Sequence, residues 1–108
     1  MFEFKINNTH WTIEEKDKEQ MRLKADNDYT MGLTCYIEQK IYLLKDQANL
    51  IKSLKHELTH VWLYEYGHAQ NNDTEYNYED ICEIVASSND FINEVVKKYK
   101  EKENGFLQ

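Results

Sequence analysis

The sequence predicts an α+β fold in which a small antiparallel sheet packs on two long helices. Residues 1–44 contain stretches of β-branched and aromatic residues that alternate with polar ones, which is typical of strands. The residues that follow carry two stretches with apolar residues at helical spacing. The chain has 108 residues, of which 41% are hydrophobic and 13% aromatic, enough for one core. We therefore expect a single domain over residues 1–108.

Four strands and one short helix are expected in the first part of the chain. Phe2–Ile6 alternates apolar and polar residues, and a second strand at residues 11–13 follows two turn-forming asparagines. Residues 16–25 are polar and predict a short surface helix. Residues 33–37 and 41–44 are rich in β-formers, and the polar residues between them predict a hairpin.

Two helices are expected after the hairpin. The first covers about residues 47–66 and ends at Gly67, because glycine commonly follows a helix C-terminus. A polar loop over residues 67–77 comes next. The second helix covers about residues 78–102, and its last turns hold four lysines, which suit the negative end of the helix dipole.

The charge of the chain argues against nucleic acid as a partner. Its 13 basic and 20 acidic side chains give a net charge of −7, unlike a protein held by phosphate contacts. Residues 56–96 contain no Lys or Arg, whereas Asp and Glu occur nine times. Each of these acids alone is typical of a solvated surface, but as a set they create a negative field that draws a cation.

The sequence predicts a cytoplasmic protein. No apolar run approaches the ~18 residues of a membrane span, and the N-terminus lacks the basic and apolar regions of a signal peptide. Two cysteines, Cys35 and Cys82, are too few for a disulfide scaffold and fit a reducing compartment. The composition favours a monomer.

The segment from His56 to His60 matches the pattern H-E-x-x-H. Histidines four residues apart lie on one face of a helix, so both imidazoles can bind one Zn²⁺. Glu57 then sits beside the metal and takes a proton from a metal-bound water, whose pKa the zinc lowers to about 7. The pattern therefore predicts a zinc endopeptidase that acts on a protein or peptide substrate, with Glu57 as the catalytic base.

The predicted helix keeps these histidines away from its apolar side. With His56 at zero and about 100° per residue, His60 falls at about 40°, and the apolar residues fall between about 120° and 240°. We therefore do not expect core histidines, and the alternative to a metal site is a solvated polar face. The apolar stripe, which includes Trp62 as an expected core residue, comprises Leu50, Ile51, Leu54, Leu58, Val61 and Trp62.

A third protein ligand is needed, because catalytic zinc has three protein ligands and an open fourth position. The residues after His60 exclude the three-histidine variant of the motif, and His68 does not fit its spacing. On the second helix, Glu79, Glu83 and Asp90 share the face opposite the apolar stripe. They are ligand candidates if both helices bury their stripes in one core, and ordinary exposed acids otherwise. That second stripe comprises Ile81, Ile84, Val85, Phe91, Ile92, Val95 and Val96.

The HELTH segment followed by a glutamate on a downstream helix resembles the gluzincin metallopeptidases. In that family the third ligand is often written E-x-x-A, a form that residues 83–86 have and residues 79–82 lack. The resemblance therefore implies Glu83 as the third zinc ligand, with Glu79 as its hydrogen-bonding neighbour or substitute.

The resemblance extends to the small ImmA/IrrE-type metallopeptidases of phages and other mobile elements. Residues 31–34 (MGLT), residues 41–43, the stretch HELTHVWLYEYG and the Glu-rich helix carry it over roughly residues 10–96. It implies a minimal zincin-like fold and a specific protein substrate, such as a repressor of a mobile element. It also implies that an edge strand, at residues 33–37 or 41–44, holds the substrate in extended form.

The oxyanion donor and the function each have alternatives. The donor is sought among the polar aromatic residues near the motif, namely Tyr64, Tyr66, His68, Tyr76 and Tyr78. A loop that folds over the cleft favours His68 and Tyr76. Cys82 is expected as a buried thiol rather than as a fourth ligand. The first alternative function is a catalytically silent, metal-stabilised acidic protein that binds a host factor, and the second is a structural zinc domain with four protein ligands.

Overall fold

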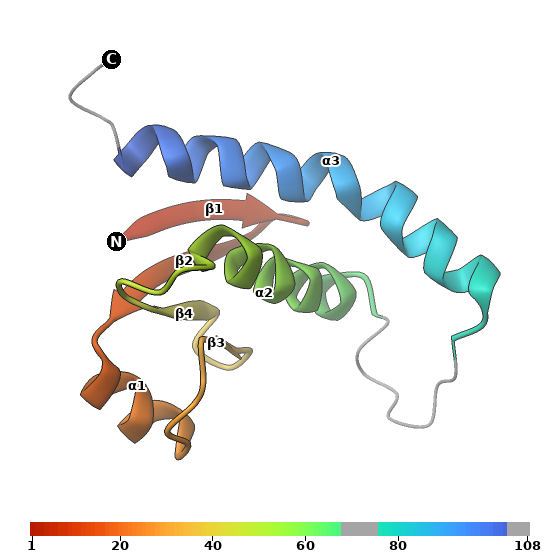
Figure 1. The fold of residues 1–108 in the computed structure, drawn as a ribbon. Coiled ribbons are helices and arrows are strands. Elements are labelled where there is room, and N and C mark those ends of the chain that lie inside the picture. The colour runs from red at the N-terminus through yellow and green to blue at the C-terminus, as the bar shows by residue number, and fades with distance from the viewer. Residues whose placement is uncertain (68–75, 104–108) are drawn as a thin grey trace.

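The computed structural model describes residues 1–67 and 76–103, which form an α+β fold with a four-stranded mixed sheet and three helices (Figure 1). Helices α2 and α3 lie on one side of the sheet, and α1 lies on the other. The elements are β1 (Phe2–Ile6), β2 (Thr9–Lys16), α1 (Lys18–Ala25), β3 (Gly32–Cys35), β4 (Lys40–Leu44), α2 (Leu50–Glu65) and α3 (Tyr78–Glu103).

The strands lie in the order β1-β2-β4-β3. The pairs β1–β2 and β3–β4 are antiparallel, whereas β2 and β4 run parallel. The prediction of an antiparallel sheet is therefore wrong at its central pair. The reason lies in the chain between these two strands. The segment that contains α1 and β3 forms the long crossover connection that a parallel pair needs.

The turns of both hairpins contain residues with left-handed backbone. Asn7 and Asn8 have φ values of 50° and 64°, the geometry that a two-residue hairpin turn requires and that asparagine tolerates. In the second hairpin, Gln39 has a φ of 57° directly before β4. The hairpin expected between residues 33–37 and 41–44 is confirmed, with its strands at Gly32–Cys35 and Lys40–Leu44.

The short helix α1 begins at Lys18 because Asp17 caps it. The Asp17 carboxylate accepts a hydrogen bond from the backbone N–H of Gln20, and the Gln20 side chain accepts one from the backbone N–H of Asp17. Met21 is the buried residue of this helix. The surface helix expected over residues 16–25 is confirmed with this later start.

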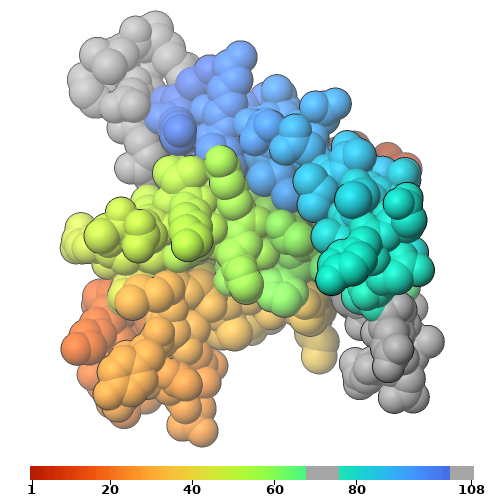
Figure 2. Space-filling model, turned by 45° about the vertical axis from the view of Figure 1, so that its right-hand side comes forward, coloured from red at the N-terminus to blue at the C-terminus, as the bar shows by residue number. Residues whose placement is uncertain are grey.

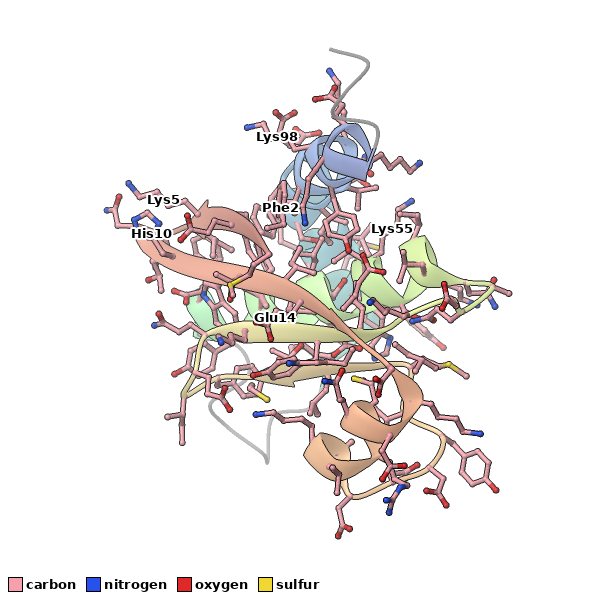
Figure 3. The ribbon with its side chains drawn as sticks, turned by 90° about the vertical axis from the view of Figure 1, so that its left-hand side faces the viewer. Phe2, Lys5, His10, Glu14, Lys55 and Lys98 are labelled. Carbon is pink, nitrogen blue, oxygen red and sulfur yellow. The ribbon has the colours of Figure 1, made fainter. Side chains whose placement is uncertain are left out.

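The core lies between the sheet and helices α2 and α3. Figure 3 shows Phe2 directed from β1 toward α3, whereas Lys5 and His10 lie at the outer end of the first hairpin. Trp62, expected as a core residue, is 9% exposed. The other buried members of the core are Phe4, Ile6, Trp11, Ile13, Ile41, Leu43, Leu54, Leu58, Val61, Val95, Val96 and Tyr99.

Helix α2 starts three residues later than the expected start at residue 47. Gln47 instead fixes the turn before it, because its side-chain Nε2 donates to the backbone oxygens of Met31 and Leu44, both at 2.9 Å. Gly67 follows the helix with a φ of 84°, as expected for a glycine after a helix C-terminus.

Helix α3 is buried mainly through its second half, where the hydroxyl of buried Tyr99 donates to Glu15 at 2.6 Å. In the first half, Ile81 and Val85 are 48% and 58% exposed. The predicted apolar stripe therefore enters the core there only through Ile84, which is partly buried, because these turns extend past the end of α2 (Figure 1). Cys82 is exposed as well, so the expectation of a buried thiol is wrong.

The two halves of α3 should respond differently to the same truncation. Val95→Ala removes methyl groups from the core and should lower the free energy of unfolding by about 2 kcal/mol. Val85→Ala is the matched control and should change it by less than about 0.5 kcal/mol. Urea denaturation of the metal-free protein measures both, and equal losses would contradict the exposure of the first turns.

Candidate metal and catalytic site

His56 and His60 project side by side from the exposed face of α2. Their Nε2 atoms are 3.3 Å apart, and their ring centroids are 4.9 Å apart. Two nitrogens that each lie about 2.05 Å from a tetrahedral zinc ion are separated by about 3.3 Å. The pair therefore fits two ligands of one zinc ion. The same distance also suits a hydrogen bond between two neutral imidazoles, so metal content has to distinguish the two arrangements.

Glu57 lies between α2 and the strand β3, where it is only 7% exposed. Its Oε1 accepts a hydrogen bond from the Thr34 hydroxyl at 2.9 Å, and the same hydroxyl lies 3.4 Å from the Glu57 backbone oxygen. The carboxylate is therefore held in one orientation on the same two turns of α2 as the histidines, and a catalytic base must be fixed in this way.

Gly32 makes the close approach of β3 to Glu57 possible. A Cβ atom at this position would lie 2.9 Å from both Cγ and Oε2 of Glu57. Gly32 belongs to the MGLT segment, and no role is predicted for it from the sequence. The available signal was a glycine in a strand pattern, which often marks a close approach of the backbone.

Strand β3 is an edge strand, whereas β4 is interior. Of the two candidates for substrate pairing, residues 33–37 therefore contain the strand with a free side. The backbone N–H of Leu44 donates to the oxygen of Met31, so by antiparallel alternation Gly32 and Thr34 direct their N–H and C=O groups away from β4. These groups are the ones that an added strand would meet.

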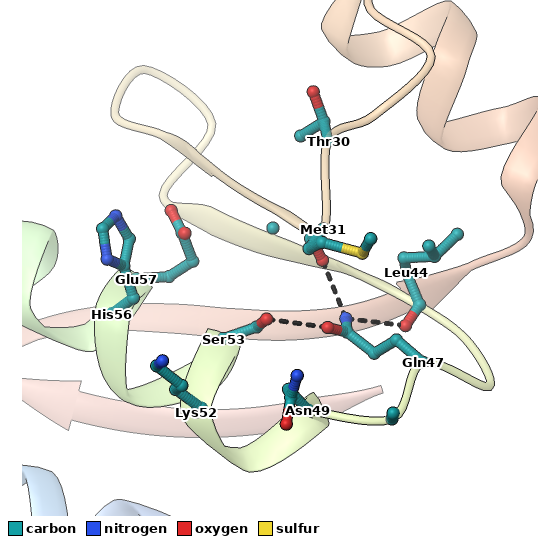
Figure 4. Close-up of a pocket in the computed structure, with 11 residues that line it drawn as sticks. Thr30, Met31, Leu44, Gln47, Asn49, Lys52, Ser53, His56 and Glu57 are labelled. Atoms are coloured by element: carbon teal, nitrogen blue, oxygen red, sulfur yellow. Dashed lines mark hydrogen bonds between the residues drawn. The ribbon is translucent and has the colours of Figure 1, made fainter.

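A groove of about 540 Å³ runs between the start of β3 and the first turns of α2, with His56 and Glu57 at one end (Figure 4). Gln47 lines this groove and is held in place there, because its side-chain oxygen accepts a hydrogen bond from the Ser53 hydroxyl at 2.7 Å. The lining residues are Thr30, Met31, Gly32, Leu44, Gln47, Ala48, Asn49, Lys52, Ser53, His56 and Glu57.

Tyr36 lies close enough to Glu57 to feel its charge, although the sequence predicts no role for it. Its ring stacks on Tyr64 at a centroid distance of 4.6 Å. Burial raises the pKa of the Tyr36 phenol above its usual value, and the charges of Glu57 and Tyr64 add to the rise. The phenol therefore stays protonated at neutral pH and is able to donate a hydrogen bond. Only pairing in the folded sheet brings it here, because it lies far upstream of the motif.

The oxyanion donors expected from the sequence are less well placed. Tyr66 and Tyr76 are 49% and 38% exposed, and Tyr78 is 88% exposed. Tyr64 is the exception, because its ring contacts Tyr36. His68, the other favoured donor, lies outside the described residues.

The third zinc ligand is not assembled with the histidine pair. Glu83 is exposed, and its Oε1 accepts from the Ser87 hydroxyl at 3.1 Å. Glu79 and Asp90 are exposed as well. Among residues 1–67 and 76–103, no three His, Cys, Asp or Glu side chains gather closely enough to hold a metal ion. The structure thus brings the rings of His56 and His60 together, holds the Glu57 carboxylate on Thr34, and does not bring Glu83 into a cluster with them.

Comparison with family models, curated proteins and solved structures found no match for this chain. Over the part of the chain that the structure describes, no helix is long and apolar enough to cross a membrane. The site is therefore interpreted from its own geometry.

Replacing Gly32 tests the contact between β3 and Glu57. Gly32→Ala should lower the free energy of unfolding by about 1–3 kcal/mol, because the new methyl group overlaps the Glu57 side chain. The control is the same substitution in a Glu57→Ala background, where the space is free and the loss should fall below about 1 kcal/mol. Equal losses in both backgrounds, measured by urea denaturation, would rule out the contact.

The pKa of Tyr36 should depend on Glu57. Difference titration of the wild type against Tyr36→Phe, followed by tyrosinate absorbance, should show Tyr36 ionising above the usual value of about 10. Because the folded state disfavours the phenolate, this group should cost stability as pH rises above that value. In Glu57→Gln the Tyr36 titration should move to lower pH. An unchanged titration would place the two groups apart.

Proposed function

We propose that this protein is a zinc-dependent endopeptidase with a minimal zincin-like fold, related in design to the ImmA/IrrE-type peptidases that its sequence resembles. The observation that carries the proposal is the pair of Nε2 atoms 3.3 Å apart on one face of α2. The buried carboxylate of Glu57 lies next in sequence to His56 and borders a groove beneath a free strand edge. These are the parts that hydrolysis of an extended peptide requires.

His56 and His60 would hold the zinc ion, and Glu83 from α3 is the proposed third ligand, with Glu79 as its substitute. A bound zinc ion would supply Lewis-acid chemistry and lower the pKa of a coordinated water. Supplying Glu83 requires the first turns of α3 to move toward α2. Ile81 and Val85 are exposed, so partly buried Ile84 is the core contact of these turns.

The chain's own residues would carry the proton. The Glu57 carboxylate accepts a proton from the attacking water and delivers it to the leaving amine. Thr34 keeps one oxygen of this carboxylate occupied, which fixes the direction of the other. The protonated phenol of Tyr36 is the proposed donor to the carbonyl oxygen as negative charge develops on it.

The substrate would be a protein segment that adds to the free side of β3 in extended form. Gly32 and Thr34 would supply the backbone hydrogen bonds, and the groove would receive side chains. In Figure 2 the outer face of α2 lies open between α3 and the α1–β3 region, where such a segment would pass. The resemblance in sequence favours a repressor of a mobile element as that protein.

A catalytically silent binding protein is the second candidate. It is favoured by the first turns of α3, which leave Glu83 away from the histidines and expose apolar Tyr78, Ile81 and Val85. In this function, metal and acidic groups would stabilise a binding surface without turnover.

Zinc content distinguishes metal binding from a histidine hydrogen bond. Protein purified without added metal should contain about one zinc per chain, and His60→Ala should lose it. Glu83→Ala should lower zinc affinity about 10- to 100-fold or more, whereas Glu79→Ala, its matched control one turn earlier, should retain the metal. Loss in Glu79→Ala alone would move the third ligand by one turn. A wild type that takes up no zinc would rule out the proposed enzyme.

Glu57→Gln separates the two candidate functions. The variant should keep zinc, because Glu57 is not a proposed ligand, and should lose cleavage by at least about 10²-fold. Cleavage of a randomised peptide library, read by mass spectrometry, measures this. Activity equal to that of the wild type would exclude Glu57 as the base.

A further inference from the structure

Lys52 lines the wall of the groove beside the catalytic residues. In Figure 4 it stands on α2 between Asn49 and His56. The other charged lining residue is Glu57, whose carboxylate is buried and held by Thr34. Within the described residues, no carboxylate lies within ion-pair distance of the Lys52 amine. The groove therefore presents an unpaired cation to whatever enters it.

One polar neighbour of Lys52 in the groove lining, Gln47, is already occupied by hydrogen bonds. The Gln47 side chain uses its amide on Met31, Leu44 and Ser53, so it has little capacity left for a ligand. Helix α2 also begins at this groove, and its first turn contains no acidic residue. The positive end of its dipole thus has the same sign as Lys52.

The direction of an added strand decides which substrate residue reaches the groove. The start of β3, with Met31 and Gly32, borders the groove, and the chain after β3 leads to Tyr36 beside Tyr64. Antiparallel pairing is the more stable arrangement per residue, and it places the C-terminal half of the substrate at the start of β3. The residues that follow the cleaved bond therefore pass over the groove.

The charges at the two ends of the site are opposite in sign. Lys52 lies at the start of α2, whereas Glu79, Asp80 and Glu83 lie on the first turns of α3, near the other end of α2. A substrate with an acidic side chain after the cleaved bond matches the end with Lys52, and would be repelled by the opposite end.

We propose that the enzyme prefers an acidic residue, Asp or Glu, directly after the bond it cleaves, and that Lys52 in the groove selects it. This inference rests on the proposed peptidase function and names the substrate class of that site. Lys52 is a specificity residue here, so its replacement should change which peptides are cut and leave zinc binding unchanged.

The test uses a synthetic peptide library randomised at its central positions, with cleavage sites mapped by mass spectrometry. Zinc-loaded wild type should cut with Asp or Glu about fivefold enriched over Lys or Arg after the bond, the size expected of a solvent-accessible ion pair. Lys52→Gln should bring this ratio to about one, and Lys52→Glu should invert it. Lys55→Glu, one turn away and not part of the groove lining, is the matched control and should behave as the wild type.

The outcomes separate this inference from the function on which it rests. Cleavage without acidic preference, or an equal response to Lys52→Glu and Lys55→Glu, would overturn the role of Lys52 and leave the peptidase intact. Enrichment of acids before the cleaved bond would overturn the antiparallel placement. Absence of cleavage by zinc-loaded wild type would reject the peptidase and the inference together. Urea denaturation and zinc content of each variant confirm that folded protein is compared.

Discussion

The contact between Glu57 and strand β3 is the interaction on which the candidate site depends. The hydroxyl of Thr34 binds the carboxylate, and the missing side chain of Gly32 allows α2 to lie close to the strand. This contact and the buried apolar stripe of α2 together set the orientation of α2 against the sheet. That orientation turns the histidine pair outward and leaves the groove between the two elements. A larger residue at position 32 would separate them and remove the site as a unit.

The strands and helices could be predicted from the sequence because each depends on local pattern. Alternation in Phe2–Ile6, the asparagine turn after it and the helical stripe of α2 are all properties of neighbouring residues. The order of the strands in the sheet, in contrast, does not depend on local sequence pattern. Whether β4 pairs with β2 or lies at the edge depends on the path of α1 across the sheet, and no short-range pattern encodes that path. The parallel central pair was therefore missed.

The candidate site likewise has one part that local sequence pattern predicts and another part that depends on the whole fold. His56, Glu57 and His60 lie within two turns of one helix, so their spacing alone predicts that they meet. Tyr36 comes near Glu57 only through the fold, since β3 must first pair with β4 and then lie against α2. Glu83 was expected to meet the histidines if both apolar stripes entered one core. Ile81 and Val85 remain exposed instead and only Ile84 packs against the core, so that condition is met only in part in the first turns of α3.

The position of Glu83 follows from the balance between packing and metal binding. Ile81 lies about 160° around the helix from Glu83, so a helix that buries Ile81 in the core turns Glu83 away from it. The buried second half of α3 fixes the rotation of this continuous helix, but its first turns touch the core only through partly buried Ile84. A carboxylate–zinc bond is strong compared with the exposed hydrogen bond between Ser87 and Glu83. Zinc would therefore be able to draw these turns toward the histidines, which makes assembly of the site and binding of the metal one event.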